Sequence, residues 1–137
     1  MLDHTDKRIL EELAKDGRIS MKKLGEKVHL TGQAAANRVA KLEEDEVIEG
    51  YTVRLNYKKA GYAVHSFITV FTKSFDHQPF LSFVEAQQAY VVHKYKISGD
   101  GCYLLECRFP SNEELDRFLT ELSHYVNYKL SVAISEI

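Results

Sequence analysis

Apolar residues in the first part of the chain recur at the three- and four-residue spacing of amphipathic helices. This spacing predicts three helices, over residues 3–16, 20–28 and 31–44, each preceded by a polar residue that can cap it. The candidate caps are Asp3 or Thr5, then Ser20, then Thr31. The apolar faces would close one small core, formed by Leu13, Leu24, Val28, Leu30, Val39, Leu42 and Ile48.

The third predicted helix has a slender, polar side opposite its buried stripe. Ala35, Val39 and Leu42 fall at positions i, i+4 and i+7 and form the apolar stripe. The residues left facing outward are Gln33, Ala34, Asn37, Arg38 and Lys41. Two helices joined by a tight turn, the second one small and polar on its outer side, are typical of a helix-turn-helix.

The segment over residues 47–57 is rich in β-branched and aromatic residues with a rough alternation of character. We expect a strand there, acting as a wing or as a linker. Lys58-Lys59-Ala60-Gly61 breaks this pattern, so residues 58–63 are expected to be a linker.

From residue 64 onward the pattern becomes that of alternating strands interrupted by two helix signals. Pro79 marks the first turn of one helix, and Ser111 with Glu114 has the spacing of a capping box. The order β-α-β-β-α-β predicts a ferredoxin-like unit with both helices on one sheet face. The opposite face of the sheet must also be buried, and we expect a second copy of the chain to pack against it. The expected strands cover residues 64–72, 90–97, 102–109 and 128–134, with helices over 76–88 and from 111 onward.

Composition limits this picture further. The chain has 137 residues, of which 45% are hydrophobic and 28% charged, as in a folded protein of one ordinary domain or two small ones. No apolar run approaches the roughly 20 residues that cross a bilayer, and the polar N-terminus is unlike a signal peptide. Cys102 and Cys107 have an odd spacing on one predicted strand, so they point to opposite faces and cannot pair. We expect a cytoplasmic protein with two buried, reduced thiols and no membrane partner.

The net charge of −2 argues against indiscriminate coating of nucleic acid. The charges are nevertheless uneven, because five basic residues and only one acidic residue lie between Lys22 and Lys41. A local basic patch of this kind is what a small DNA-reading module needs. A solvated helix face is the alternative interpretation.

A helix in the major groove must fit a channel about 12 Å wide, so alanines near its start permit close approach to the bases. Amide side chains pair with adenine edges, basic ones with guanine or phosphate, and a helix N-terminus accepts phosphate. The candidate DNA-binding residues are Lys22, Lys23, Thr31, Gln33, Ala34, Asn37, Arg38 and Lys41. Two alternatives stay open: the alanines can serve helix packing, and Arg38 can pair with Glu43 or Glu44.

No catalytic, metal or cofactor site is indicated by the sequence. The six histidines show no pair at helical metal spacing. A phosphate-binding glycine loop, a nucleophile elbow and a zinc-protease motif are also absent. We therefore expect no enzyme activity, no metal and no cofactor.

Two stretches carry a resemblance that covers essentially the whole chain: “LDHTDKRILEELAKDGRIS” and “KLGEKVHLTGQAAANRVAKLEEDEVIEGY”. Followed by one β-α-β-β-α-β unit, they resemble the Lrp/AsnC family, the feast/famine transcription regulators. The resemblance implies a sequence-specific regulator that binds double-stranded DNA and forms homodimers, with tetramers or octamers left open. It also implies an amino acid or similar small effector, bound between dimers.

The resemblance places the effector beside Gly99 and Asp100, in the stretch “SGDGCYLL”. Gly101 and Cys102 replace an aromatic residue and a second acid of the family pattern there. Glu46 stands where the family usually has a glycine, which implies that the third helix runs on or turns less sharply.

The expected fold is therefore α+β, a winged helix-turn-helix followed by a ferredoxin-like domain. The expected domains are residues 1–57 for DNA binding, 58–63 as linker and 64–137 for oligomerisation and effector binding. Two other functions stay open. Some ferredoxin-like relatives of the family are enzymes that decarboxylate tetrapyrroles, and an architectural DNA-binding protein would need no effector.

Overall fold

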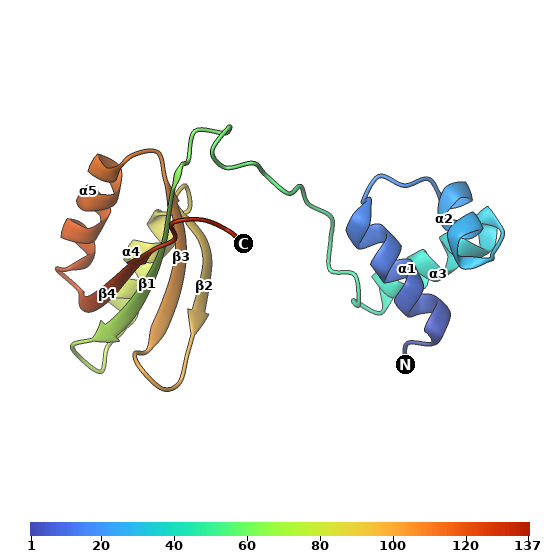
Figure 1. Cartoon of the computed structure of the whole chain (residues 1–137). Coiled ribbons are helices and arrows are strands. Elements are labelled where there is room, and N and C mark those ends of the chain that lie inside the picture. The colour runs from blue at the N-terminus through green and yellow to red at the C-terminus, as the bar shows by residue number, and fades with distance from the viewer. The chain divides into compact units, whose positions relative to one another are not determined.

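A computed structural model describes all 137 residues, which form two compact units, Met1–Arg54 and Leu55–Ile137. The first unit is helical and the second combines a sheet with helices (Figure 1). None of the helices is long and apolar enough to span a bilayer.

Three helices make up the first unit: α1 (His4–Lys15), α2 (Met21–Val28) and α3 (Gly32–Glu44) (Figure 1). All three predicted helices are confirmed, and the first of the two candidate caps for α1 is the one used. In each case a side-chain oxygen of the cap accepts the backbone N–H three residues further on. The caps are Asp3, Ser20 and Thr31.

The core of the first unit takes apolar side chains from all three helices. Its buried members are Ile9, Ile19, Leu24, Val28, Ala35, Val39 and Leu42. The stripe predicted on α3 is therefore confirmed. Leu13, Leu30 and Ile48, which were also expected in this core, pack against it but stay partly exposed.

The strand expected over residues 47–57 is wrong, because the segment between α3 and the first strand contains no strand. Most of its apolar side chains are exposed, with Val53 at 73% of its accessible surface. A strand needs a neighbour to pair with its backbone N–H and C=O groups, and this segment pairs with none of the four strands of the chain. β-branched and aromatic residues favour a strand only where their side chains can pack against neighbouring strands, so composition alone does not make this segment a strand.

The connection after α3 also differs from expectation. The helix ends at Glu44 and does not run on. Glu46 adopts φ 58°, in the left-handed region that a glycine takes without strain. The turn is therefore as sharp as the one a glycine would make, although a glutamate stands there.

The second unit contains six elements in the order β-α-β-β-α-β, as predicted. They are β1 (Val64–Thr72), α4 (Gln78–Ala86), β2 (Val91–Lys96), β3 (Tyr103–Phe109), α5 (Asn112–Leu122) and β4 (Val126–Val132). The sheet has the order β2-β3-β1-β4 with every neighbouring pair antiparallel, which is the ferredoxin-like arrangement (Figure 1). The last strand lies two residues earlier than the pattern indicated.

One face of this sheet is covered by α4 and α5. Ile68 and Val70 of β1 point into a core that includes Phe80 and Phe83 of α4 and Phe118 of α5. The opposite face, called the open face below, has no helix over it. Its members, by strand register, are His65, Phe67, Thr69, Phe71, His93, Tyr95, Leu104, Glu106, Arg108, Asn127, Lys129 and Ser131, and none of them is fully buried.

Two local expectations for this unit need correction. Ser111 accepts the N–H of Glu114, but the Glu114 carboxylate turns to Tyr90 and Arg117 instead of completing a capping box. Cys107 is buried as expected, whereas Cys102 lies just before β3 and is only partly buried.

Candidate nucleic-acid interface and effector turn

The turn between α2 and α3 depends on close backbone packing at two glycines. A Cβ atom added to Gly25 would lie 2.5 Å from the carbonyl oxygen of Leu30, and one added to Gly32 would lie 3.3 Å from Cα of Lys22. His29, at φ 62°, reverses the chain between the two helices. The first turn of α3 therefore lies against the first turn of α2.

The outer side of α3 is polar and open to solvent. Gln33, Asn37 and Lys41 are exposed, and Ala34 between them is partly exposed. Nε2 of Gln33 donates to Oδ1 of Asn37 at 3.0 Å. The pair therefore presents the amide nitrogen of Asn37 and the oxygen of Gln33 outward, a set of donors and acceptors suited to base edges.

Basic groups flank this side of the helix. Lys22 and Lys23 are exposed on the first turn of α2, close to the N-terminus of α3. Lys41 lies 3.3 Å from Asp45, but both side chains are more than half exposed, and such pairs contribute only about 0–1 kcal/mol. A phosphate can therefore compete for Lys41. Thr31 uses its hydroxyl to cap α3, so its contribution to anion binding would come from the N–H groups that follow it.

Arg38 differs from its neighbours on α3 because its guanidinium is already paired. Nη1 lies 2.7 Å from Oδ2 and 2.9 Å from Oδ1 of Asp3, and 3.2 Å from Oδ1 of Asp6. The pairing considered from the sequence, with Glu43 or Glu44, is not the one that forms. The hydrogen bond from Arg38 holds the pKa of Asp3 below its ordinary value, and the two carboxylates raise the pKa of Arg38.

Asp3 and Asp6 were missed as functional candidates. Their spacing indicates a helix cap, and they do form a reciprocal capping box. The contact between Arg38 and Asp3 joins residues 35 positions apart. It depends on how α1 packs against α3, and a local sequence pattern does not predict that packing.

The predicted effector residues lie in the turn between β2 and β3. Gly99, at φ 99°, and Asp100 are both exposed. Gly101 follows at φ 89°, where an added Cβ would lie 2.7 Å from Cγ2 of Thr69. Because the N–H of Cys102 also donates to the carbonyl of Val70 at 2.7 Å, the base of this turn is fixed against β1.

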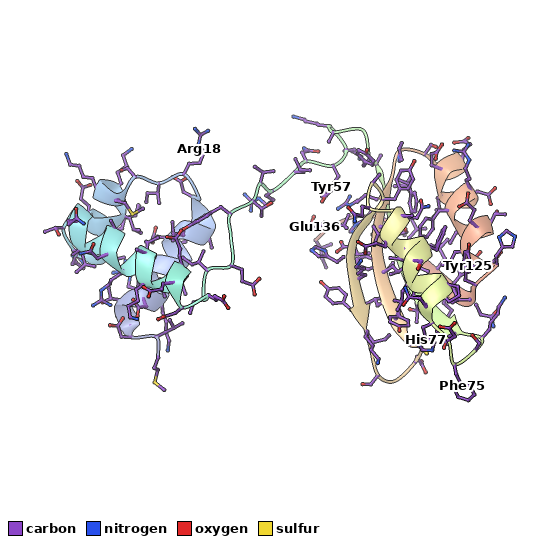
Figure 2. All side chains as sticks on the ribbon, turned by 180° about the vertical axis from the view of Figure 1, so that it is seen from behind. Arg18, Tyr57, Phe75, His77, Tyr125 and Glu136 are labelled. Carbon is purple, nitrogen blue, oxygen red and sulfur yellow. The ribbon has the colours of Figure 1, made fainter.

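Other polar side chains surround this turn at the same end of the sheet. Oγ1 of Thr72 lies 3.3 Å from Sγ of Cys102, and Nδ1 of His77 lies 2.9 Å from the hydroxyl of Tyr103. Figure 2 shows His77 at the start of α4 and Phe75 projecting from the preceding loop. No group of three side chains able to hold a metal ion occurs among the 137 residues.

On the open face, the partly buried carboxylate of Glu106 contacts two histidines. Nε2 of His65 lies 2.7 Å and Nδ1 of His93 2.9 Å from the two oxygens of Glu106. Burial acts to raise the pKa of Glu106, but the hydrogen bonds to His93 and His65 outweigh it and hold that pKa below its ordinary value. Beside them, the guanidinium of Arg108 stacks 4.2 Å from the ring centre of Tyr57. His65, His93, Glu106 and Arg108 of this face are thus paired, Lys129 of β4 is exposed, and the aromatic and aliphatic side chains of the face remain uncovered.

Comparison with known proteins matches both units. The AsnC-type helix-turn-helix domain matches residues 2–43, and the Lrp/AsnC ligand binding domain matches residues 65–137. The HTH-type transcriptional regulator LrpA of Bacillus subtilis is 52% identical over 136 residues, which is 99% of this chain and 100% of that protein.

Solved structures agree with this match. The structure of B. subtilis LrpC superposes with a TM-score of 0.94 at 34% identity, over 100% of this chain and 97% of that one. A transcriptional regulator of Neisseria meningitidis in complex with L-methionine superposes with a TM-score of 0.91 at 28% identity, over 100% and 92% of the two chains. The helix-turn-helix followed by a four-stranded antiparallel sheet with helices is therefore the fold of these regulators.

Proposed function

The chain is a transcriptional regulator that belongs to the Lrp/AsnC family, and on this premise we propose that the outer side of α3 binds the major groove of DNA. One observation carries the proposal. Gln33, Asn37 and Lys41 are exposed together on the side of α3 opposite the buried residues Ala35 and Val39. A side that bears two amides and an ammonium, with no bulky group among them, suits base edges better than a protein core.

The other candidate residues have distinct parts in this proposal. Ala34 keeps the surface low, so that Gln33 and Asn37 can approach the bases. Lys22 and Lys23 bind backbone phosphates beside the groove, together with the free N–H groups that follow Thr31. These contacts set the register of the helix, and the amides provide sequence preference.

The open face supports a homodimer. It carries the exposed Tyr95 and the partly exposed Leu104, and a second copy would cover them. Two recognition helices would then bind half-sites about 34–36 Å apart, or at multiples of that spacing. Larger assemblies of these dimers remain compatible with the chain.

The turn at Gly99 and Asp100 supports binding of an amino acid between dimers. Asp100 offers an exposed carboxylate for an α-amino group, and Gly99 leaves room beside it. A regulator of this fold from Neisseria meningitidis was solved with L-methionine. We assign residues 1–57 to DNA binding, 58–63 to a linker and 64–137 to assembly and effector binding, in a regulator that acts in the cytoplasm without catalytic activity.

Selection of genomic DNA fragments by the purified chain tests this proposal. We expect enrichment of a short sequence with two related half-sites, and a change in its affinity when a panel of amino acids is added. Retention of random fragments at equal affinity would contradict sequence-specific recognition. Enrichment that no amino acid alters would leave DNA recognition in place and contradict the effector.

A further inference from the structure

The contact between Arg38 and the start of α1 is built from pre-oriented groups. Oδ1 of Asp3 accepts the N–H of Asp6 at 2.8 Å, and Oδ2 of Asp6 accepts the N–H of Asp3 at 3.3 Å. Both carboxylates are therefore held on the first turn of α1 by the helix cap itself. Arg38 then joins this cap to the middle of α3. We call these three side chains the Arg38 cluster (Arg38, Asp3 and Asp6).

Arg38 stands at the border between the core and the outer side of α3. It precedes Val39, which is buried, and follows Asn37, which is exposed. The core contacts of α3 come from small or medium side chains such as Ala35 and Val39, and apolar contacts of this kind have little directional preference. Hydrogen bonds from Nη1 to fixed carboxylates do have direction. They therefore specify how α3 is rotated and tilted against α1.

The charges of the cluster oppose a direct contact with DNA. One guanidinium faces two carboxylates, so one positive and two negative charges leave an excess negative charge. A phosphate that approached Arg38 would meet this excess charge. Moving Arg38 to the phosphate would leave Asp3 and Asp6 unpaired next to the DNA backbone. Lys41 has no such barrier, because its single partner is exposed.

We propose that Arg38 is a positioning residue for DNA recognition: bound to Asp3 and Asp6, it fixes the orientation of α3 and does not contact DNA. The proposal rests on the assignment of α3 as the recognition helix. It gives Arg38 a role other than the DNA contact expected from the sequence. It also adds two acidic residues, at the N-terminus of α1, to the groups on which specific binding depends.

Binding of the full chain to a genomic fragment that it enriches, and to a random fragment, provides the test. The variants are Arg38→Ala and the pair Asp3→Asn with Asp6→Asn, in which asparagine retains the capping ability of aspartate. We expect both to lose about tenfold or more of the specific affinity, since misplaced base contacts cost that much. The slope of log affinity against log salt should stay that of the wild type in both variants, and the paired asparagine variant should bind random DNA at least as tightly as the wild type. Lys41→Ala serves as the contrast and should lower that slope by about one.

Two outcomes would overturn the proposal. If the paired asparagine variant binds the specific fragment as tightly as the wild type or more tightly, while Arg38→Ala lowers the salt slope by about one, Arg38 contacts phosphate. If the asparagine variant loses specific and random binding alike, the cluster serves folding only. Failure of the wild-type chain to prefer any fragment is a different result, and it would count against the proposed function instead.

Discussion

At the scale of single residues, the two cysteines occupy different surroundings. Cys107 is fully buried on β3, where desolvation raises the pKa of its thiol to about 12. Cys102 is partly exposed, and its hydrogen bond with Thr72 holds the pKa of its thiol below the ordinary value. Since the thiolate is the reactive form, the two thiols should differ widely in reactivity.

We predict that brief treatment with iodoacetamide at mildly alkaline pH labels Cys102 and spares Cys107 in the folded chain. Peptide mass spectrometry measures the two sites separately, and unfolding in urea should make both reactive. Cys102→Ser is the control and should remove the fast labelling. Equal labelling of both thiols in the native chain would show that β3 is not packed as described.

Glu46 is the residue with backbone strain outside the helix-turn-helix turn. Its φ of 58° lies in the left-handed region, which costs a residue with a Cβ atom about 1–2 kcal/mol. We predict that Glu46→Gly raises the free energy of unfolding by up to about 1 kcal/mol, because glycine takes this conformation without strain. Urea denaturation followed by circular dichroism measures the change.

The same substitution at Glu44 is the matched control for this prediction. Glu44 is the last residue of α3, where a glycine lowers stability by at most the about 0.5–1 kcal/mol that it costs inside a helix. The two substitutions remove the same side chain and should have opposite effects on stability. A loss of stability at Glu46 equal to that at Glu44 would show that the turn does not adopt the left-handed conformation.

At the scale of elements, the packing of α2 against the start of α3 depends on Gly25. A methyl group there would overlap backbone oxygen atoms that cannot move away without shifting α3. We predict that Gly25→Ala lowers the free energy of unfolding of the first unit by about 1–3 kcal/mol and weakens specific DNA binding. Thermal unfolding followed by circular dichroism is the measurement. Gly50→Ala, where an added Cβ meets nothing within 4 Å, is the control and should be nearly neutral.

Elements whose signals are local were predictable from the sequence. Ser20 and Thr31 predicted the starts of α2 and α3, because an N-cap residue binds a backbone N–H within the first turn of its own helix. The alternation over residues 64–72 predicted β1 because one side of that strand is buried. The fold of both units followed from such signals.

Features that depend on distant or absent partners were not predictable in this way. The pairing of Arg38 with Asp3 requires α1 and α3 to be packed first. The segment over residues 47–57 has the composition of a strand but no partner strand within the chain. The positive φ of Glu46 is set by the direction that the chain takes after α3. A glutamate by itself prefers a negative φ, so its identity does not predict this conformation.

At the scale of the whole molecule, we expect two chains to associate through the open face. We predict that Leu104→Lys, in the middle of that face, lowers the molar mass in solution from that of a dimer or larger assembly toward the 15.7 kDa of one chain. A lysine there would have to be desolvated in the interface. Size-exclusion chromatography with light scattering measures the mass.

The same substitution on the other side of the unit is the control. Leu81 is exposed on α4, and Leu81→Lys should leave the dimer intact. Dissociation by Leu81→Lys, with none by Leu104→Lys, would place the interface on the helices and contradict the use of the open face.

Recognition of DNA sequence by the outer side of α3 is tested by the double variant Gln33→Ala with Asn37→Ala. Its control is Gln78→Ala with Ser82→Ala, which removes a hydrogen-bonded pair at the same spacing on α4. Fluorescence anisotropy should show that the α3 variant loses about tenfold or more of its affinity for the enriched fragment, with random DNA bound as before. Wild-type affinity for the enriched fragment in the α3 variant would contradict the account.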